Sequence, residues 1–278
     1  MACEEQEQAA REGRDISPRE FEEHALSDCK RVIGVMSGKG GVGKSLVTGI
    51  LACELQRAGM SVGILDADIT GPSIPRMFGL ADAGVEGFGD LYLPRISEGG
   101  IKVMSTNLLL PHEDDPVLWR GPMLAGAIRQ FWSQTSWGPL DCMLIDMPPG
   151  TGDVALTVFQ SLPVDGVIVV TSPQDLVSMI VGKAVHMCER MEIDVLGLVE
   201  NMAYVRCPDC GREIEVFGTS HLDEACERYG LASLGRLPLD PRFASMCDTG
   251  TLEAGLEAGL LPSAVDVIRA IEPHSSEK

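Results

Sequence analysis

The sequence has little positive charge for its length. Its 278 residues include 22 Lys and Arg against 41 Asp and Glu, which gives a formal net charge of −19 at pH 7. A surface of that sign repels nucleic-acid phosphates and anionic lipid headgroups. We therefore expect neither a nucleic acid nor a membrane as a partner.

Long hydrophobic runs and export signals are also missing. No apolar run in the sequence approaches the roughly 18 residues that a membrane-spanning helix requires. Residues 1–15 contain neither the basic leader nor the apolar segment of a secretory signal. We expect a cytoplasmic protein, in which the nine cysteines remain thiols or serve as metal ligands.

Seven short β-rich segments alternate with segments of helix length. The segments are residues 31–37, 61–67, 101–106, 141–147, 165–171, 195–201 and 232–238. Nearly continuous apolar runs are typical of strands that are buried on both faces, and helical crossovers between strands imply parallel pairing. The pattern predicts an α/β fold with a doubly wound, mainly parallel sheet of about seven strands and helices on both faces.

We expect one domain with appendages. Residues 1–30 are highly charged and are predicted to be a mobile arm, in which a capping box at Ser17 starts a short helix that ends near Ala25. The domain is predicted to fill residues 31–273, with a short tail at 274–278. An insertion near residues 206–220 separates the sixth predicted strand from a helix that begins near His221.

A phosphate-binding loop follows the first predicted strand and opens a helix. The loop matches G-x-x-x-x-G-K-[ST] and consists of Gly38, Lys39, Gly40, Gly41, Val42, Gly43, Lys44 and Ser45. Its glycines let backbone N–H groups converge on phosphates, Lys44 is expected to neutralise the β- and γ-phosphates, and the Ser45 hydroxyl is expected to hold Mg²⁺. This pattern in this context predicts a nucleotide site.

Polar side chains follow three of the predicted strands. Asp66 and Asp68 follow the second strand, Asp146 ends the fourth, and Asn201 ends the sixth. Because the carboxyl ends of parallel strands face the ligand crevice, Asp146 is interpreted as a Walker B acid that holds the metal's water shell, and Asp68 as the group that orients the attacking water. Asn201 is a candidate hydrogen-bond partner for a purine edge. The competing interpretation of each residue is a turn former.

Cys207 and Cys210 form a C-x-x-C pair whose two thiolates can converge on one metal ion or one cluster edge. A redox dithiol is disfavoured, because such pairs usually open a helix whereas residues 212–218 resemble a strand. Two thiolates leave two coordination positions to fill. Either two chains share one 4Fe-4S cluster, or His221 and Cys226 complete a zinc site, for which their separation of about 140° around a helix is awkward.

Several motifs in order along residues 32–250 resemble the Mrp/ApbC family of P-loop ATPases. They are GKGGVGKS, LDADITGPSIP, WRGPM, LIDMPPGTGD, the QDL after VVTSP, ENMAY, CPDCG and GRLPLDPRF. The resemblance implies a homodimeric cytoplasmic ATPase that binds an iron-sulfur cluster at Cys207 and Cys210 and carries it to apo-proteins. It also implies that Asn201 meets the nucleotide base. Relatives with a second, N-terminal cluster have four closely placed cysteines there, whereas residues 1–30 offer only Cys3 and Cys29.

The same resemblance implies roles for the nucleotide-site residues. Lys39, directly after the first glycine, is the signature of the deviant Walker A class and reaches the partner's nucleotide across a dimer. Lys44 and Ser45 bind phosphate and Mg²⁺. Asp68 and Asp146 are the switch acids. Hydrolysis of ATP is expected to be slow unless the dimer completes the site.

Other deviant P-loop ATPases fit the sequence less well. A Min-type membrane ATPase needs a basic amphipathic helix, but residues 262–278 contain only one Arg and one Lys. A partition-type ATPase needs a basic DNA-binding face, and a nitrogenase-type reductase needs a cysteine in the loop 146–153, which has none. The remaining alternative is a nucleotide-switched scaffold with structural zinc at the C-x-x-C pair and no cluster transfer.

Overall fold

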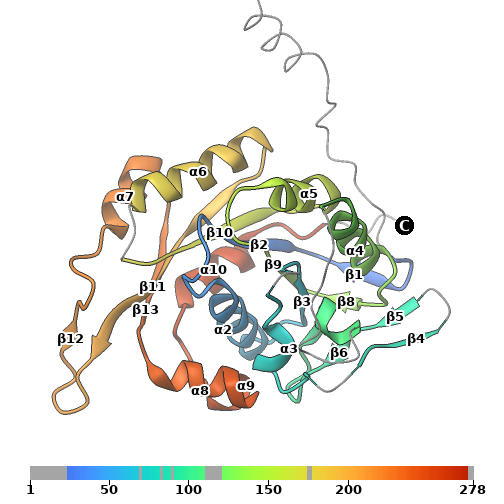
Figure 1. Cartoon of the computed structure of the whole chain (residues 1–278), viewed down its shortest axis with the longest axis horizontal. Coiled ribbons are helices and arrows are strands. Elements are labelled where there is room, and N and C mark those ends of the chain that lie inside the picture. The colour runs from blue at the N-terminus through green and yellow to red at the C-terminus, as the bar shows by residue number, and fades with distance from the viewer. Residues whose placement is uncertain are drawn as a thin grey trace, which may run out of the picture.

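A mainly parallel sheet forms the centre of the protein (Figure 1). The computed structural model describes residues 24–68, 71–81, 84–88, 91–109, 121–173 and 177–274. Parallel pairing joins seven strands in the spatial order β13-β11-β10-β2-β9-β3-β7. Their bounds are β2 (Val32–Ser37), β3 (Val62–Asp66), β7 (Lys102–Met104), β9 (Cys142–Asp146), β10 (Gly166–Thr171), β11 (Val195–Arg206) and β13 (Ser233–Pro238). Each predicted strand is present, and the predicted fold class is confirmed.

Short antiparallel and peripheral strands extend this arrangement. β6 (Arg95–Ile96) pairs with β7 and β12 (Glu213–Ile214) pairs with β11, which brings the sheet to nine strands. Two further pairs lie outside it. They are β1 (Ser27–Cys29) with β8 (Gly138–Leu140), and β4 (Glu86–Phe88) with β5 (Leu91–Leu93). Apart from β12, which lies within the strand-like residues 212–218, these short strands were not predicted, because each carries too little periodicity of its own.

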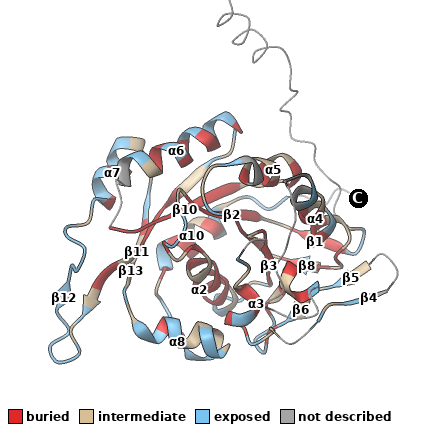
Figure 2. Cartoon of the chain, viewed as in Figure 1, coloured by how far each residue is buried: buried red, intermediate tan, exposed pale blue. Residues whose placement is uncertain are grey.

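Helices cover both faces of the sheet and bury a separate apolar cluster on each (Figures 1 and 2). One face is covered by α4 (Gly121–Ser133), α5 (Asp153–Ser161), α6 (Val177–Arg190) and α7 (Leu222–Tyr229). The other is covered by α2 (Lys44–Arg57), α3 (Ile74–Met77), α8 (Pro241–Thr249), α9 (Leu252–Gly255) and α10 (Pro262–Ala270), beside the short 3₁₀ helix η1 (Thr106–Leu109). In the described ranges no helix is both long and apolar enough to cross a bilayer.

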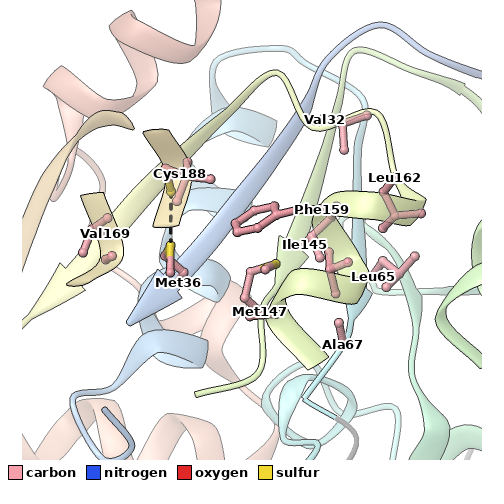
Figure 3. Packing of buried hydrophobic residues seen from close by; sticks show 14 of the residues in the cluster. Val32, Met36, Leu65, Ala67, Ile145, Met147, Phe159, Leu162, Val169 and Cys188 are labelled. Carbon is pink, nitrogen blue, oxygen red and sulfur yellow. Dashed lines mark hydrogen bonds between the residues drawn. The ribbon is translucent and has the colours of Figure 1, made fainter. Parts of the chain in front are cut away.

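Strand β2 shows how the sequence specifies this double coverage. Val32 and Met36 point into the cluster under α5 and α6, whereas Ile33 and Val35 point into the cluster under α2. Side chains alternate between the faces of a strand, so a strand covered on both sides is apolar throughout. Figure 3 shows Met36 beside the thiol of Cys188 from α6, with an S···S distance of 3.8 Å. The strand that leads into the nucleotide loop is therefore held from both sides.

The folded domain begins before the predicted boundary at residue 31. Strand β1 is buried, and the Ser27 hydroxyl donates to the Thr135 carbonyl at 3.1 Å and accepts from the Trp137 amide at 3.0 Å. At the other end, His274 was assigned to the tail but lies 2.8 Å from an oxygen of Asp165. These long-range contacts involve single polar residues, which explains why the sequence pattern did not reveal them. Residues 1–23 of the predicted arm, which include Cys3 and most of the predicted helix, lie outside the described residues.

Phe159 of α5 offers a test of the core. Its side chain is 2% exposed in the cluster drawn in Figure 3, so we expect Phe159→Ala to lower the free energy of unfolding by about 3–5 kcal/mol. Phe217→Ala is the matched control, since Phe217 is 37% exposed and its truncation should cost less than about 1 kcal/mol. Urea denaturation of the two variants measures both values. Equal losses would contradict the burial of Phe159.

Candidate functional site

The loop between β2 and α2 is shaped by glycines whose missing side chains leave room for close contacts. Gly43 is the N-cap of α2 and has a left-handed φ of 82°. A Cβ on Gly43 would lie 2.1 Å from Nδ2 of Asn201, and a Cβ on Gly38 would lie 2.1 Å from a methyl group of Ile180. The loop therefore packs tightly on its neighbours and leads directly into the N-terminus of α2, the arrangement found in phosphate-binding loops.

Lys44, the first residue of α2, lies among acidic groups at the ends of β3 and β9. Its Nζ donates to Oδ1 of Asp146 at 2.8 Å and lies 3.6 Å from Oδ2 of Asp68. Lys44 is 6% exposed and Asp146 is fully buried. Because a buried charge is costly without a partner, the lysine and the two carboxylates stabilise one another. The sequence predicted that all three lie at the nucleotide crevice, and the fold brings them together.

Two hydroxyl groups complete the surroundings of Asp146. Ser45 Oγ donates to Oδ2 at 2.6 Å, and Thr48 Oγ1 lies 2.8 Å from Oδ1. Hydroxyl and carboxylate oxygens are the hard ligands that Mg²⁺ prefers, so Ser45 and Asp146 fit the predicted metal role. Thr48 was not predicted as a site residue. Its position one helical turn after Lys44 places it on the same face of α2, and this spacing is the signal that would have found it.

Asp66 supports the turn that carries Asp68. Its carboxylate is fully buried, accepts from the Asp68 amide at 3.2 Å, and accepts from the Ser105 hydroxyl at 3.1 Å. Burial raises the pKa of Asp66 well above its ordinary range, and the neighbouring carboxylate of Asp146 raises it further. Asp66 thus stabilises the turn from inside the protein, whereas the side chain of Asp68 is 14% exposed and lies beside Lys44.

The glycine-rich segment after Asp146 lies against the phosphate-binding loop. The Gly150 amide donates to the Ser37 carbonyl at 2.9 Å, and the Met147 amide donates to the Val35 carbonyl at 3.0 Å. A Cβ on Gly40 would lie 3.8 Å from Cβ of Pro149, so the two loops are in contact. Lys39 is half-buried at this junction. A displacement of one loop therefore directly affects the position of the other.

Asn201, the predicted partner of a purine edge, lies against the phosphate-binding loop and bonds its backbone. Its side chain is 1% exposed, and Nδ2 donates to the Val42 carbonyl at 2.9 Å. The amide occupies the space left by the absent side chain of Gly43. Its Oδ1 is buried with no hydrogen-bond partner among the described residues. The observed geometry is that of a residue that supports the loop backbone.

The C-x-x-C pair lies on an exposed hairpin, residues 207–219, that follows β11 (Figures 1 and 2). The Gly211 amide donates to the Cys207 carbonyl at 2.9 Å and closes a tight turn. Backbone N–H groups of Cys210 and then Asp209 lower the pKa of Cys207. Since the thiolate is the form that binds metals and clusters, the turn favours the ligand form of this cysteine. Cys210 is exposed, whereas Cys29, Cys53, Cys142, Cys188 and Cys226 are buried.

The alternative zinc ligands are not assembled around this pair. His221 Nδ1 lies 3.0 Å from Oε2 of Glu224, and Cys226 is 8% exposed within the apolar cluster under α6 and α7. Across the described ranges, no three His, Cys, Asp or Glu side chains are grouped so that they could hold a metal ion. In the part that the structure describes, one chain therefore offers the thiols of Cys207 and Cys210 but no third or fourth ligand beside them.

Two relatives match most of the chain in sequence. The chain is 49% identical over 231 residues to the iron-sulfur cluster carrier protein of Clostridium perfringens, a match that covers 81% of each protein. It is 45% identical over 230 residues to the iron-sulfur cluster carrier protein of Methanocaldococcus jannaschii, covering 81% of this chain and 78% of that one. These similarities agree with the resemblance to the Mrp/ApbC family.

Solved structures and a family model give the same assignment. A nucleotide-binding protein from Archaeoglobus fulgidus, solved in complex with ADP, superposes with a TM-score of 0.75 at 39% identity and covers 90% of this chain and 95% of its own. The cell division ATPase MinD of Pyrococcus furiosus shares the fold at a TM-score of 0.60 and 20% identity, covering 86% and 97%. The family model of the NUBPL iron-transfer P-loop NTPases matches residues 28–264. This chain therefore belongs to the ParA family, among the P-loop NTPases of the NUBPL iron-transfer type.

Proposed function

We propose that this chain is an ATP-hydrolysing iron-sulfur cluster carrier that acts as a cytoplasmic homodimer and delivers a 4Fe-4S cluster to apo-proteins. The observation that carries the proposal is the exposed C-x-x-C hairpin that directly follows β11, the strand whose Asn201 bonds the phosphate-binding loop. Two relatives with 49% and 45% identity are named iron-sulfur cluster carrier proteins, which supports the same cargo. The apo-proteins are the acceptors and the cluster is transported, not consumed.

The nucleotide chemistry follows from the side chains around Asp146. The N–H groups at the start of α2 bind the phosphates, and Lys44 exchanges its carboxylate contacts for the β- and γ-phosphate oxygens. Ser45 and Asp146 would hold Mg²⁺, which supplies neutralisation of the charge on the phosphates. Asp68 orients the attacking water in this proposal, which its position 3.6 Å from Nζ of Lys44 supports. The ADP complex of the Archaeoglobus fulgidus relative supports a nucleotide at this loop.

Two features of the proposal require a second copy of the chain. Each chain offers two thiolates, so two hairpins related by a two-fold axis provide the four ligands of one cluster. Lys39 is the residue that reaches the partner's nucleotide in this proposal. The zinc-scaffold alternative is less well supported, because Cys207 and Cys210 have no grouped third and fourth ligands in the described ranges.

Lys44→Ala tests the nucleotide site. We expect the Kd for ATP to rise by about 10- to 100-fold or more, because a charged hydrogen-bond donor to the phosphates is lost. Isothermal titration calorimetry with Mg·ATP measures this change. Lys183→Ala, which removes an exposed lysine of α6, is the matched control and should bind as the wild type does. An unchanged Kd in Lys44→Ala would overturn the role of the loop.

Asp68→Asn tests the hydrolytic step. The variant should bind ATP with a Kd within about threefold of wild type, but its kcat should fall about 100-fold, since an amide is a poor acceptor for the proton of the attacking water. Phosphate release at saturating ATP gives kcat, and calorimetry gives Kd. Turnover at the wild-type rate would assign the orienting role to another group.

Cys207→Ser tests the cargo site. After anaerobic reconstitution with iron and sulfide, we expect one 4Fe-4S cluster per two chains in the wild type and none in the variant, with the cluster-linked dimer lost. Iron and sulfide analysis with size-exclusion chromatography measures both. Cys247→Ser, at a partly buried cysteine of α8, is the matched control and should retain the cluster. One zinc per chain that depends on His221 or Cys226 would contradict the carrier proposal.

A further inference from the structure

Strand β11 connects the phosphate-binding loop to the cysteine hairpin. Asn201, in the middle of the strand, bonds the Val42 carbonyl of the loop, and Cys207 follows the last residue of the strand. The strand is irregular between these points, since Met202 has a left-handed φ of 58° and the pairing with β13 shifts register between Glu200 and Tyr204. The irregular segment divides β11 into two parts. The part before it is buried in the core, and the part after it leads to the hairpin.

A buried acid lies directly beside Asn201. Glu200 is fully buried, accepts from the Ser220 hydroxyl at 2.9 Å, and accepts from Nε of Arg236 at 3.2 Å. Arg236 belongs to the neighbouring strand β13 and is half-buried. A charge this deep in the sheet is retained only with a partner, so the Glu200–Arg236 pair fixes the position of the guanidinium.

The other end of the same guanidinium holds the hairpin. Nη2 of Arg236 donates to Oε1 of Glu215 at 2.9 Å, and the guanidinium also lies 5.8 Å from the ring of Tyr204. Arg236 therefore uses one edge for the buried acid that precedes Asn201 in β11 and another for an acid of the cysteine hairpin. Lysine has no equivalent fork, because its charge is a single point.

The hairpin has few other attachments. Residues 208–219 are all exposed, and strand β12 contributes only two residues of pairing to β11. Beyond β11 itself, the Arg236–Glu215 bond is the only side-chain hydrogen bond or ion pair from residues 207–219 to the rest of the described chain. A small shift of Arg236 is therefore transmitted to the hairpin with little to oppose it.

We propose that Arg236 is a positioning residue that couples nucleotide binding at the phosphate-binding loop to the arrangement of the Cys207–Cys210 hairpin. This inference rests on the proposed function for its purpose, since it names how nucleotide regulates the cargo site. A nucleotide displaces the loop backbone, Asn201 and Glu200 follow, and the Arg236 fork moves Glu215 with them. The coupling is carried by two ion pairs that share one guanidinium.

Thiol reactivity of the intact, cluster-free chain tests the coupling. The rate of iodoacetamide labelling at Cys207 and Cys210 is followed by mass spectrometry, with and without Mg·ADP. We expect nucleotide to change the rate in the wild type by about fivefold or more, a value within the usual range of coupling between sites. In Arg236→Gln and in Arg236→Lys the change should fall below about twofold, while the Kd for ADP stays within about threefold of wild type.

Two further variants make the test decisive. Glu215→Ala removes the acceptor at the hairpin end of the fork and keeps the buried Glu200–Arg236 pair, so it should lose the nucleotide response even if Arg236→Gln fails to fold. Arg242→Gln is the matched control, because Arg242 is likewise bonded to two acids, Asp240 and Glu257, but lies on α8 away from the hairpin. It should respond to nucleotide as the wild type does.

Three results would overturn the inference. They are a wild type that labels equally with and without ADP, a Glu215→Ala variant that keeps the full response, and an Arg236→Gln variant whose labelling rate changes by the same factor with and without ADP. The last result would mean that Arg236 only anchors the hairpin. The labelling experiment requires no cluster. A negative labelling result therefore does not contradict the carrier proposal, and a failed cluster reconstitution does not prevent the coupling from being measured.

Discussion

The buried carboxylate of Asp146 is the group on which the nucleotide site depends. It ends the strand between β2 and β3, and the parallel register places it beside Val35 on one side and Asp66 on the other. Lys44 and Ser45 reach it from the start of α2, so both of these residues of the phosphate-binding loop are held by the same buried carboxylate. Lys44, Ser45 and Thr48 together bond both oxygens of this buried side chain, so neither oxygen is left without a partner.

The two candidate sites differ in how they are held. The nucleotide site is built on strands buried from both sides, and its side chains are fixed by contacts from several elements. The hairpin with Cys207 and Cys210 has a two-residue ladder to β11 and, apart from its contacts with β11, one side-chain link to the rest of the described residues, to Arg236. A site that positions phosphates for transfer benefits from rigid surroundings, whereas a site that must release its cargo to another protein benefits from exposure.

The sequence predicted those parts of the fold that depend on local patterns. Apolar runs identified the seven parallel strands, and the glycine loop with Lys44 and Asp146 followed from spacing and strand ends. It did not predict the direction of Asn201, which depends on the space left by Gly43, a residue 158 positions away in the chain. Nor did it single out Glu200, because an acid inside an apolar strand becomes interpretable only when Arg236 is seen beside it.

Because residues 208–219 are exposed, selection on the stability of the fold and selection on the fit of the hairpin to its acceptors act on different residues. Substitutions in a segment without buried side chains leave the free energy of folding nearly unchanged, since surface changes usually cost less than about 0.5 kcal/mol. Evolution can therefore vary the residues around the cysteines to suit different acceptors without compensating changes in the core. The same property makes the hairpin a natural place for protein engineers to graft other metal-binding loops onto an intact nucleotide-binding scaffold.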